Sequence, residues 1–81
     1  PCNPTTSIRF ALPAARDARL DLFDVEGRRV RTLLDGFVPA GWSSVRWDGR
    51  ADDGAAVPSG VYLYRLITGH EQLSGRVTLA R

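Results

Sequence analysis

The sequence predicts an all-β fold: an antiparallel, immunoglobulin-like β-sandwich of six to seven strands, with no helix. Short apolar runs alternate with polar residues at a period of two, which is typical of strands with one buried face. Turn-forming Gly, Pro and Asp residues separate these runs, and no stretch has apolar residues at a helical period. The antibody subtype is excluded, because its Cys-Trp-Cys framework needs two cysteines and the chain has one.

Two strands with clean alternation come first. In the stretch TSIRFAL every second residue from Ile8 is a large apolar one, and Pro13 ends the run. The stretch ARLDLFD repeats this pattern. One side of each strand is therefore expected in the core. The residues on that side are Ile8, Phe10, Leu12, Ala18, Leu20 and Leu22.

A hairpin and a third strand follow. Gly27 stands where a short hairpin needs a positive φ, most simply a type I turn followed by a glycine bulge. The returning strand is expected at about residues 28–34. Its apolar residues, including the adjacent Leu33 and Leu34, do not alternate, so the strand is expected to curl or bulge. Residues 35–41 contain one Pro and two Gly and are expected to form a loop.

Two further strands are expected in WSSVRWD and GVYLYRLIT. The first places Val45 and Trp47 on the same face. The second is almost continuously apolar from Val61 to Ile67. Such a run indicates a strand that is covered on both faces or is central in its sheet.

The last strand is expected in QLSGRVTLAR, after a short turn at Gly69 and His70. Val77 and Leu79 share one face of this strand. Gly75 interrupts the strand pattern, which indicates either a bulge or a close approach of another part of the protein.

The stretch between the fourth and fifth strands raises the question of a cation site, because it contains Asp48, Asp52 and Asp53. An EF-hand loop that started at Asp48 would have Arg50 at loop position three, where a ligand oxygen is needed, so this motif is excluded. Two Asp-Gly pairs instead predict turns, in which Asp accepts a bond from the backbone downstream and Gly adopts a positive φ. We expect turns here, and a weak cation site of another kind stays open.

The aromatic residues allow two interpretations. Tyr62 and Tyr64 are two residues apart and share one face of their strand. They either form a platform for a sugar, peptide or base, or pack in the core with their hydroxyl groups bonded to the backbone, which is the favoured interpretation. A contiguous exposed patch of Trp42, Phe37 and Phe23 beside them would favour a binding surface.

Composition argues against an enzyme and against a nucleic-acid-binding protein. All eleven basic residues are Arg and are spread among nine acids, which leaves a net charge of +2 and no concentrated basic footprint. The single His, His70, lies in an expected turn, and Cys2 is far from it in sequence. The sequence therefore predicts no catalytic residue, metal site, cofactor, nucleic-acid partner or small-molecule substrate.

Several short motifs, in their order and spacing, resemble the C-terminal sorting domains of type IX secretion cargo from Bacteroidetes. Those domains are similar in turn to the Ig-like domain of flagellar hook-capping proteins. The resemblance covers essentially all 81 residues. Arg76 and Arg81 stand where the family usually has Lys, and Cys2 stands where Phe is common. The motifs are Asn3-Pro4, Asp24 and Gly27 with the following Arg-x-Val, Gly41, Trp47-Asp48-Gly49, Gly60-Val61-Tyr62, and Arg76-Val77-Thr78-Leu79-Ala80-Arg81.

This resemblance implies a non-catalytic secretion and sorting signal at the C-terminus of a larger secreted protein. Residues 1–81 would be a single domain that folds in the periplasm and reaches the cell surface behind an N-terminal passenger. Its implied partners are an outer-membrane translocon and a sortase-like peptidase. The alternative for the expected recognition residues is that they only pair as neighbouring strands and hold the sandwich together. The residues are Gly60, Val61, Tyr62, Arg76, Val77, Leu79 and Arg81.

Two other functions stay open. One is a structural or adhesive Ig-like spacer, comparable to the hook-cap domain. The other is a carbohydrate-binding module of a secreted enzyme that uses exposed aromatic rings. The candidate rings are those of Tyr62, Tyr64, Trp42 and Trp47.

Overall fold

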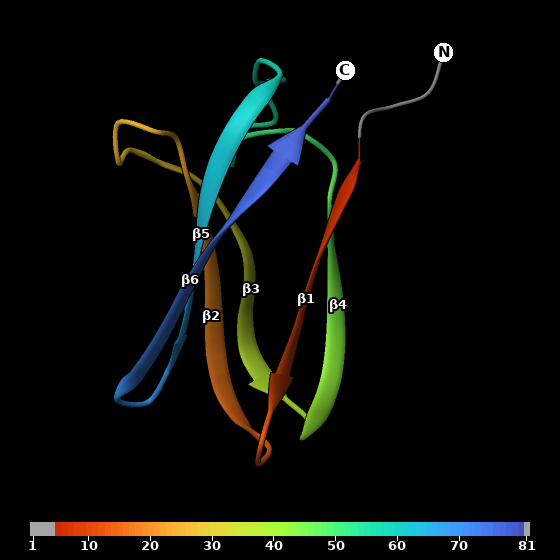
Figure 1. Ribbon diagram of the computed structural model, residues 1–81, viewed down its shortest axis with the longest axis vertical. Helices are drawn as coiled ribbons and strands as arrows, with labels where there is room; N and C mark the ends of the chain where they lie inside the picture. Colours follow the sequence, from red (N-terminus) through yellow and green to blue (C-terminus); the bar gives the residue numbers. More distant parts are fainter. Residues whose placement is uncertain (1–4, 81) are drawn as a thin grey trace.

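The computed structural model of the chain describes residues 5–80, and this part forms the predicted antiparallel β-sandwich without a helix. A four-stranded sheet has the order β3-β2-β5-β6, and a second sheet pairs β1 with β4 (Figure 1). Residues 5–80 thus contain nothing helical that could cross a membrane. The strands are β1 Thr6–Leu12, β2 Arg16–Phe23, β3 Arg29–Val38, β4 Gly41–Trp47, β5 Gly60–Thr68 and β6 Glu71–Leu79.

The core lies between the two sheets and is built largely from the side chains that the alternating pattern predicted, with Val38 and Leu66 in addition. Fully burying one large apolar side chain contributes about 1.5–3 kcal/mol, so this layer is the main source of stability. Trp47, the last residue of β4, is 0% exposed and is the largest of the fully buried side chains. The buried apolar residues are Ile8, Phe10, Leu12, Ala18, Leu20, Leu22, Val38, Trp47, Tyr62, Leu66, Val77 and Leu79.

The hairpin between β2 and β3 has the turn that Gly27 predicted. Gly27 has a φ of 86° and donates its N–H to the Asp24 carbonyl over 3.0 Å, while the Asp24 N–H bonds the Arg28 carbonyl over 2.9 Å. The expected irregularity of β3 is also confirmed. The register between β2 and β3 shifts twice, which leaves Val30 and Leu33 without a directly opposed residue on β2.

The prediction of a loop at residues 35–41 is mostly wrong, because β3 continues to Val38. The segment 35–38 pairs with the start of β2, in a register that places Val38 opposite Arg16. Val38 is buried, and its burial stabilises the extra length of strand. Only Pro39 and Ala40 remain between β3 and β4.

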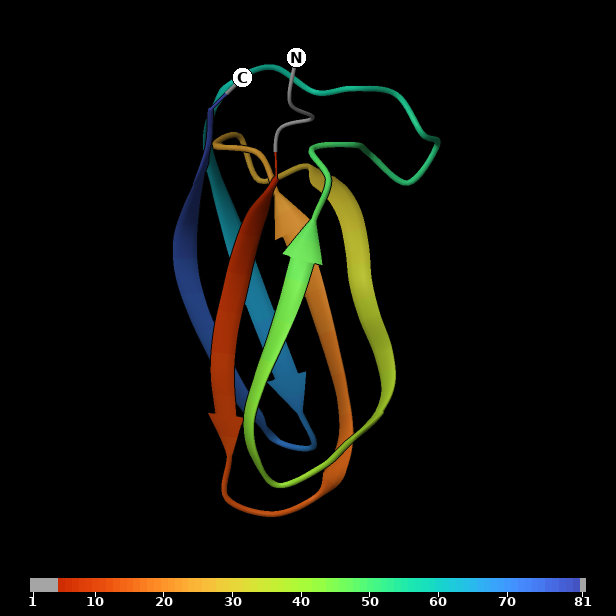
Figure 2. The same ribbon diagram turned by 90° about the vertical axis from the view of Figure 1, so that its right-hand side faces the viewer.

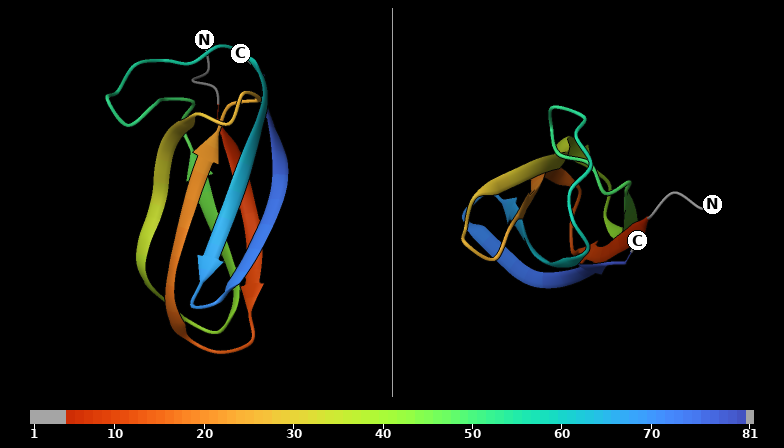
Figure 3. Two further views of the ribbon diagram at one scale, coloured as in Figure 1. Left: turned by 90° about the vertical axis from the view of Figure 1, so that its left-hand side faces the viewer. Right: turned by 90° about the horizontal axis from the view of Figure 1, so that it is seen from above.

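Strand β5 is central in its sheet, as its apolar sequence predicted, since β2 and β6 flank it. It is not covered on both faces. Val61 and Leu63 point away from the core and are 41% and 37% exposed. Within residues 5–80 no further layer lies on the outer face of the four-stranded sheet (Figure 3).

The two sheets approach each other along both sides of the sandwich. Strand β4 lies beside β3 on one side, and β1 lies beside β6 on the other (Figure 2). Neither neighbour pair forms a ladder. The end of β6 is close to the start of β1, and the two strands diverge toward the turn between β5 and β6 (Figure 1). We call the space between β1 and β6 the seam.

Candidate interaction surface

The acidic stretch between β4 and β5 forms turns, as predicted. Gly49 and Gly54 have φ values of 76° and 88°. The carboxylate of Asp48 accepts the Arg50 N–H over 3.1 Å, and that of Asp53 accepts the Ala55 N–H over 2.9 Å. No group of three His, Cys, Asp or Glu residues within residues 5–80 is arranged to hold a metal ion. The stretch is therefore a structured loop in which each carboxylate has a donor from the protein.

This loop also covers the first part of the outer edge of β3. The Asp52 N–H donates to the Val30 carbonyl over 3.0 Å, and the Asp52 carboxylate accepts the Thr32 N–H over 3.0 Å. Arg31 donates to the Asp48 carboxylate over 2.9 Å. Burial alone would raise the pKa of Asp48, but the bonds from Arg31 and from the Arg50 backbone outweigh it and lower that pKa. Loop and strand are thus held together at three successive residues of β3.

The outer edge of β6 has no such cover. Strand β6 pairs with β5 along its whole length, and no other strand of residues 5–80 bonds it. Its backbone also makes no bond to a loop in this part of the chain. An edge of this kind can accept a further strand.

The residues expected to be recognised lie next to one another in this β5–β6 pair. Gly60 is opposite Leu79, and Tyr62 is opposite Val77. The side chains of Tyr62, Val77 and Leu79 point into the core, so a partner reaches these residues only through their backbone. Gly60, Val61 and Arg76 are exposed, whereas Arg81 lies outside the described residues, as do Cys2, Asn3 and Pro4.

The interpretation of Tyr62 and Tyr64 as a binding platform is wrong, because both rings pack inside the protein. Tyr62 is 6% exposed, and its hydroxyl donates to the Pro58 carbonyl over 2.6 Å. Tyr64 packs against the core and its ring covers Gly75. Gly75 therefore marks a close approach and not a bulge, since the register between β5 and β6 is continuous there. Trp47, a further candidate for sugar binding, is fully buried.

The other aromatic side chains do not form one patch. Trp42 and Phe37 are each 71% exposed, but Trp42 lies on the two-stranded sheet and Phe37 on the four-stranded one. Phe23 lies at the opposite end of the β2–β3 ladder from Phe37. Each of two rings is stacked by an arginine: Arg9 lies 4.9 Å from the Trp42 ring, and Arg65 lies 4.7 Å from that of Phe23.

One carboxylate is buried outside the core. Asp21 is 6% exposed on the outer face of β2 and accepts bonds from the Thr32 hydroxyl over 2.7 Å and from the Arg19 Nε over 3.1 Å. No buried side-chain N or O atom in residues 5–80 lacks a hydrogen-bond partner. The Asp21 carboxylate therefore has a structural role, which is to join β2 to β3, and not a role in proton transfer.

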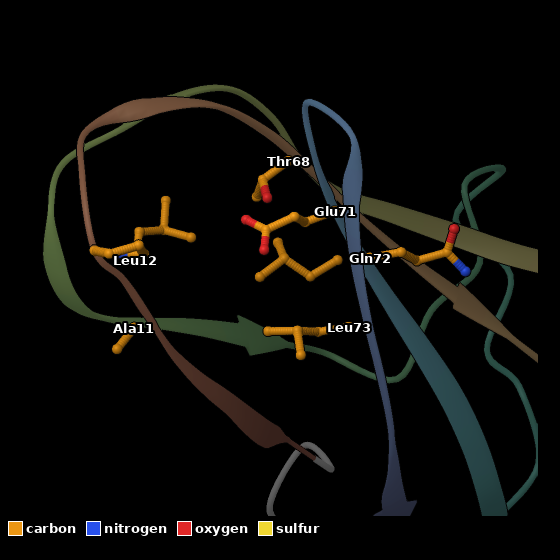
Figure 4. A pocket seen from close by; sticks show the side chains of 8 residues that line it. Ala11, Leu12, Thr68, Glu71, Gln72 and Leu73 are labelled. Carbon is orange, nitrogen blue, oxygen red and sulfur yellow. The ribbon is translucent and has the colours of Figure 1, made fainter.

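A pocket of about 200 Å³ opens in the seam, where β1 and β6 diverge. Figure 4 shows Leu12 and Glu71 pointing toward one another across it, with Leu73 at its rim. Sequence reasoning missed this site. The only signal was Leu73, a large apolar residue in an otherwise polar half of β6. The lining residues are Ala11, Leu12, Pro13, Leu66, Thr68, Glu71, Gln72 and Leu73.

Comparison with known proteins gives the family. The model of the FlgD Ig-like domain family matches residues 3–79, nearly the whole chain. The chain belongs to the FlgD Ig-like domain family. A search of curated protein sequences finds no significant match.

The crystal structure of FlgD from P. aeruginosa has the same fold as this FlgD Ig-like domain. The two superpose with a TM-score of 0.74 over 93% of this chain, at 23% sequence identity. The chain covers 59% of the length of that FlgD chain. The Ig-like, hook-cap part of the expected resemblance is therefore supported, whereas neither finding supports a type IX sorting domain.

The FlgD Ig-like domain is a structural domain family, in keeping with a non-enzymatic role. His70 is exposed in the turn between β5 and β6. The features of this FlgD Ig-like domain that are open to a partner are the outer edge of β6, the neighbouring exposed residues of β5, and the seam pocket.

Proposed function

We propose that this FlgD Ig-like domain is a non-catalytic structural module of a larger protein, comparable to a hook-cap domain, and that it acts by binding other polypeptides. The observation that carries this proposal is the family match over residues 3–79. The difference between the two edges of the four-stranded sheet supports a binding role. Residues 48–52 cover the first part of the outer edge of β3, whereas no loop or further strand within residues 5–80 covers that of β6.

The test is to delete the domain from the protein that carries it. A structural module predicts that the remaining protein is made and exported in unchanged amount but no longer assembles with its partner. Export is measured by cell fractionation and assembly by size-exclusion chromatography of the exported material. Retention of the truncated protein inside the cell would contradict this role.

Sorting through a type IX translocon is the second candidate function. It is supported by the pairing of β6 with β5: exposed Arg76 lies opposite Leu63, and exposed Gly60 and Val61 pair with the end of the same strand. In this case the domain passes through the periplasm to the cell surface. A translocon and a sortase-like peptidase are then its partners, and the passenger precedes it.

A reporter fused in front of the domain, in a host with the type IX route, tests sorting. Removing residues 79–81 is a poor probe, because Leu79 is 1% exposed and its loss would unfold the sandwich. Arg76→Glu changes only an exposed side chain and should retain the reporter in the periplasm. The matched control is Arg46→Glu, an exposed arginine of β4 in the other sheet. Equal surface display of both variants would argue against recognition at Arg76.

A further inference from the structure

We propose that the seam binds an extended strand of a partner polypeptide, which adds to the open edge of β6. The strand places a large apolar side chain in the pocket and a basic side chain next to Glu71. This inference rests on the proposed function as a binding module and specifies the chemistry of the partner.

The edges of the two sheets select the site. Asp52 bonds the first part of the outer edge of β3, at Val30 and Thr32, and β4 lies beside β3. The edges of β1 and β6 both border the seam, and no ladder joins them within residues 5–80. No ladder joins β3 to β4 either, but the seam also holds the pocket. Two unpaired strand edges offer rows of N–H and C=O groups, and only extended backbone matches such rows.

The size of the pocket also indicates part of a polypeptide. Its volume of about 200 Å³ is below the roughly 300 Å³ at which sites for separate small molecules begin. A single large side chain projecting from a bound strand fits a space of this size. Leu12 and Leu66 are apolar residues of its lining. Leu73, 57% exposed at the rim, would be covered by the added strand (Figure 4).

The negative charge of Glu71 indicates that the bound strand has a basic residue close to its apolar one. The Glu71 carboxylate points into the pocket beside the Thr68 hydroxyl (Figure 4). Arg16 of β2 lies over Gly69 in the adjacent turn, and no arginine within residues 5–80 makes an ion pair with Glu71. A Lys or Arg of the partner would therefore meet an unpaired carboxylate at the rim of an apolar site.

The probe is the synthetic peptide acetyl-Thr-Thr-Lys-Thr-Leu-Thr-Thr-amide, whose Lys and Leu share one face when it is extended. Binding is followed by amide chemical shifts of the isotope-labelled chain. The proposal predicts saturable shifts at residues 71–75 of β6 and in β1, together with slower hydrogen exchange of the β6 amides. Shifts confined to β3, or none up to the solubility limit of the peptide, would overturn it.

Variants separate the two contacts. Leu73→Ser is expected to weaken binding about tenfold by removing the apolar rim. Glu71→Lys should bind a peptide with Glu in place of Lys better than the original one. Val25→Ser, which changes an apolar residue 70% exposed in the β2–β3 hairpin, is the control and should bind normally.

Three results would count against the proposal. Equal binding by Leu73→Ser and the control would place the peptide elsewhere. An unchanged charge preference of Glu71→Lys would exclude the ion pair. Concentration-dependent dimers that protect β6 without peptide would assign the seam to a second copy of the chain. Failure of the domain-deletion test, with these peptide results intact, would overturn the structural role and leave the strand site standing.

Discussion

The indole ring of Trp47 meets the phenol ring of Tyr62 edge to face, with the ring centroids 5.0 Å apart and the planes at 75°. The contact joins β4 of the small sheet to β5 of the large one. Each ring also bonds a backbone carbonyl nearby: Trp47 Nε1 donates to Arg50 over 2.9 Å and the Tyr62 hydroxyl to Pro58 over 2.6 Å. The pair therefore anchors both ends of the β4–β5 loop.

The first prediction concerns this pair. Trp47→Ala should lower the free energy of unfolding by about 3–5 kcal/mol, because it leaves a large cavity between the sheets. Tyr62→Phe keeps the ring contact and loses one hydrogen bond, so a loss of about 1 kcal/mol is expected. Urea denaturation followed by circular dichroism measures both. Equal losses would mean that the packing of the rings contributes no more than the bond to Pro58.

The second prediction concerns the contact between Tyr64 and Gly75. A Cβ at position 75 would collide with the Tyr64 ring, so Gly75→Val should destabilise the fold by about 1–3 kcal/mol. In a Tyr64→Leu background the same change should cost clearly less, because the ring is gone. Thermal unfolding of the four proteins completes the double-mutant cycle. Additive losses would show that the ring does not cause the strain.

The third prediction concerns pH. The Asp24 carboxylate accepts the N–H groups of Arg28 and Glu26, and the Arg28 backbone bond is the main reason that the pKa of Asp24 is lowered from 3.8. The folded state then binds the proton more weakly than the unfolded state. The stabilisation is complete above pH 3.8 and is lost as the pH falls below it through the lowered pKa.

Asp24→Asn should therefore flatten the fall in stability at acid pH. Urea denaturation at a series of pH values below neutrality measures this fall. Asp35→Asn is the control, since it removes an exposed carboxylate of β3 that accepts no hydrogen bond in residues 5–80. If Asp24→Asn left the fall in stability at acid pH unchanged, protonation of Asp24 would not be what weakens the fold there.

The fourth prediction concerns the covered edge of β3. Asp52→Ala removes the acceptor of the Thr32 N–H and should speed hydrogen exchange at Thr32 about tenfold, as expected for loss of a hydrogen bond worth about 1.4 kcal/mol. Asp53→Ala removes a carboxylate bonded only to its own turn and is the control. Unchanged exchange at Thr32 in Asp52→Ala would mean that the loop does not protect the edge.

Local patterns were sufficient to predict most elements of the fold. The period of two placed Ile8, Leu20 and Val77 correctly in the core, because alternate side chains of a strand point to opposite sides whatever the partner strand is. Gly27 and the Asp-Gly pairs predicted their turns for an equally local reason, since φ is set within a few residues.

The interaction surface could not be predicted in the same way. Trp42 and Trp47 stand on opposite faces of one strand, and which of these faces is buried is decided only when the other sheet packs against it. The pocket joins Leu12 to Glu71, which are distant in sequence. No local sequence pattern predicts that two such distant residues line one pocket.

The sequence by itself determined that this chain is an antiparallel sandwich, which side of each strand is buried, and where the chain turns. These properties follow from interactions among neighbouring residues. Only the tertiary structure decided which edges are closed and which are open. That outcome depends on contacts such as the bond between Asp52 and Thr32, twenty residues apart, and on the angle at which β1 and β6 diverge. Both arise only when the two sheets pack together, because packing brings segments that are remote in sequence side by side.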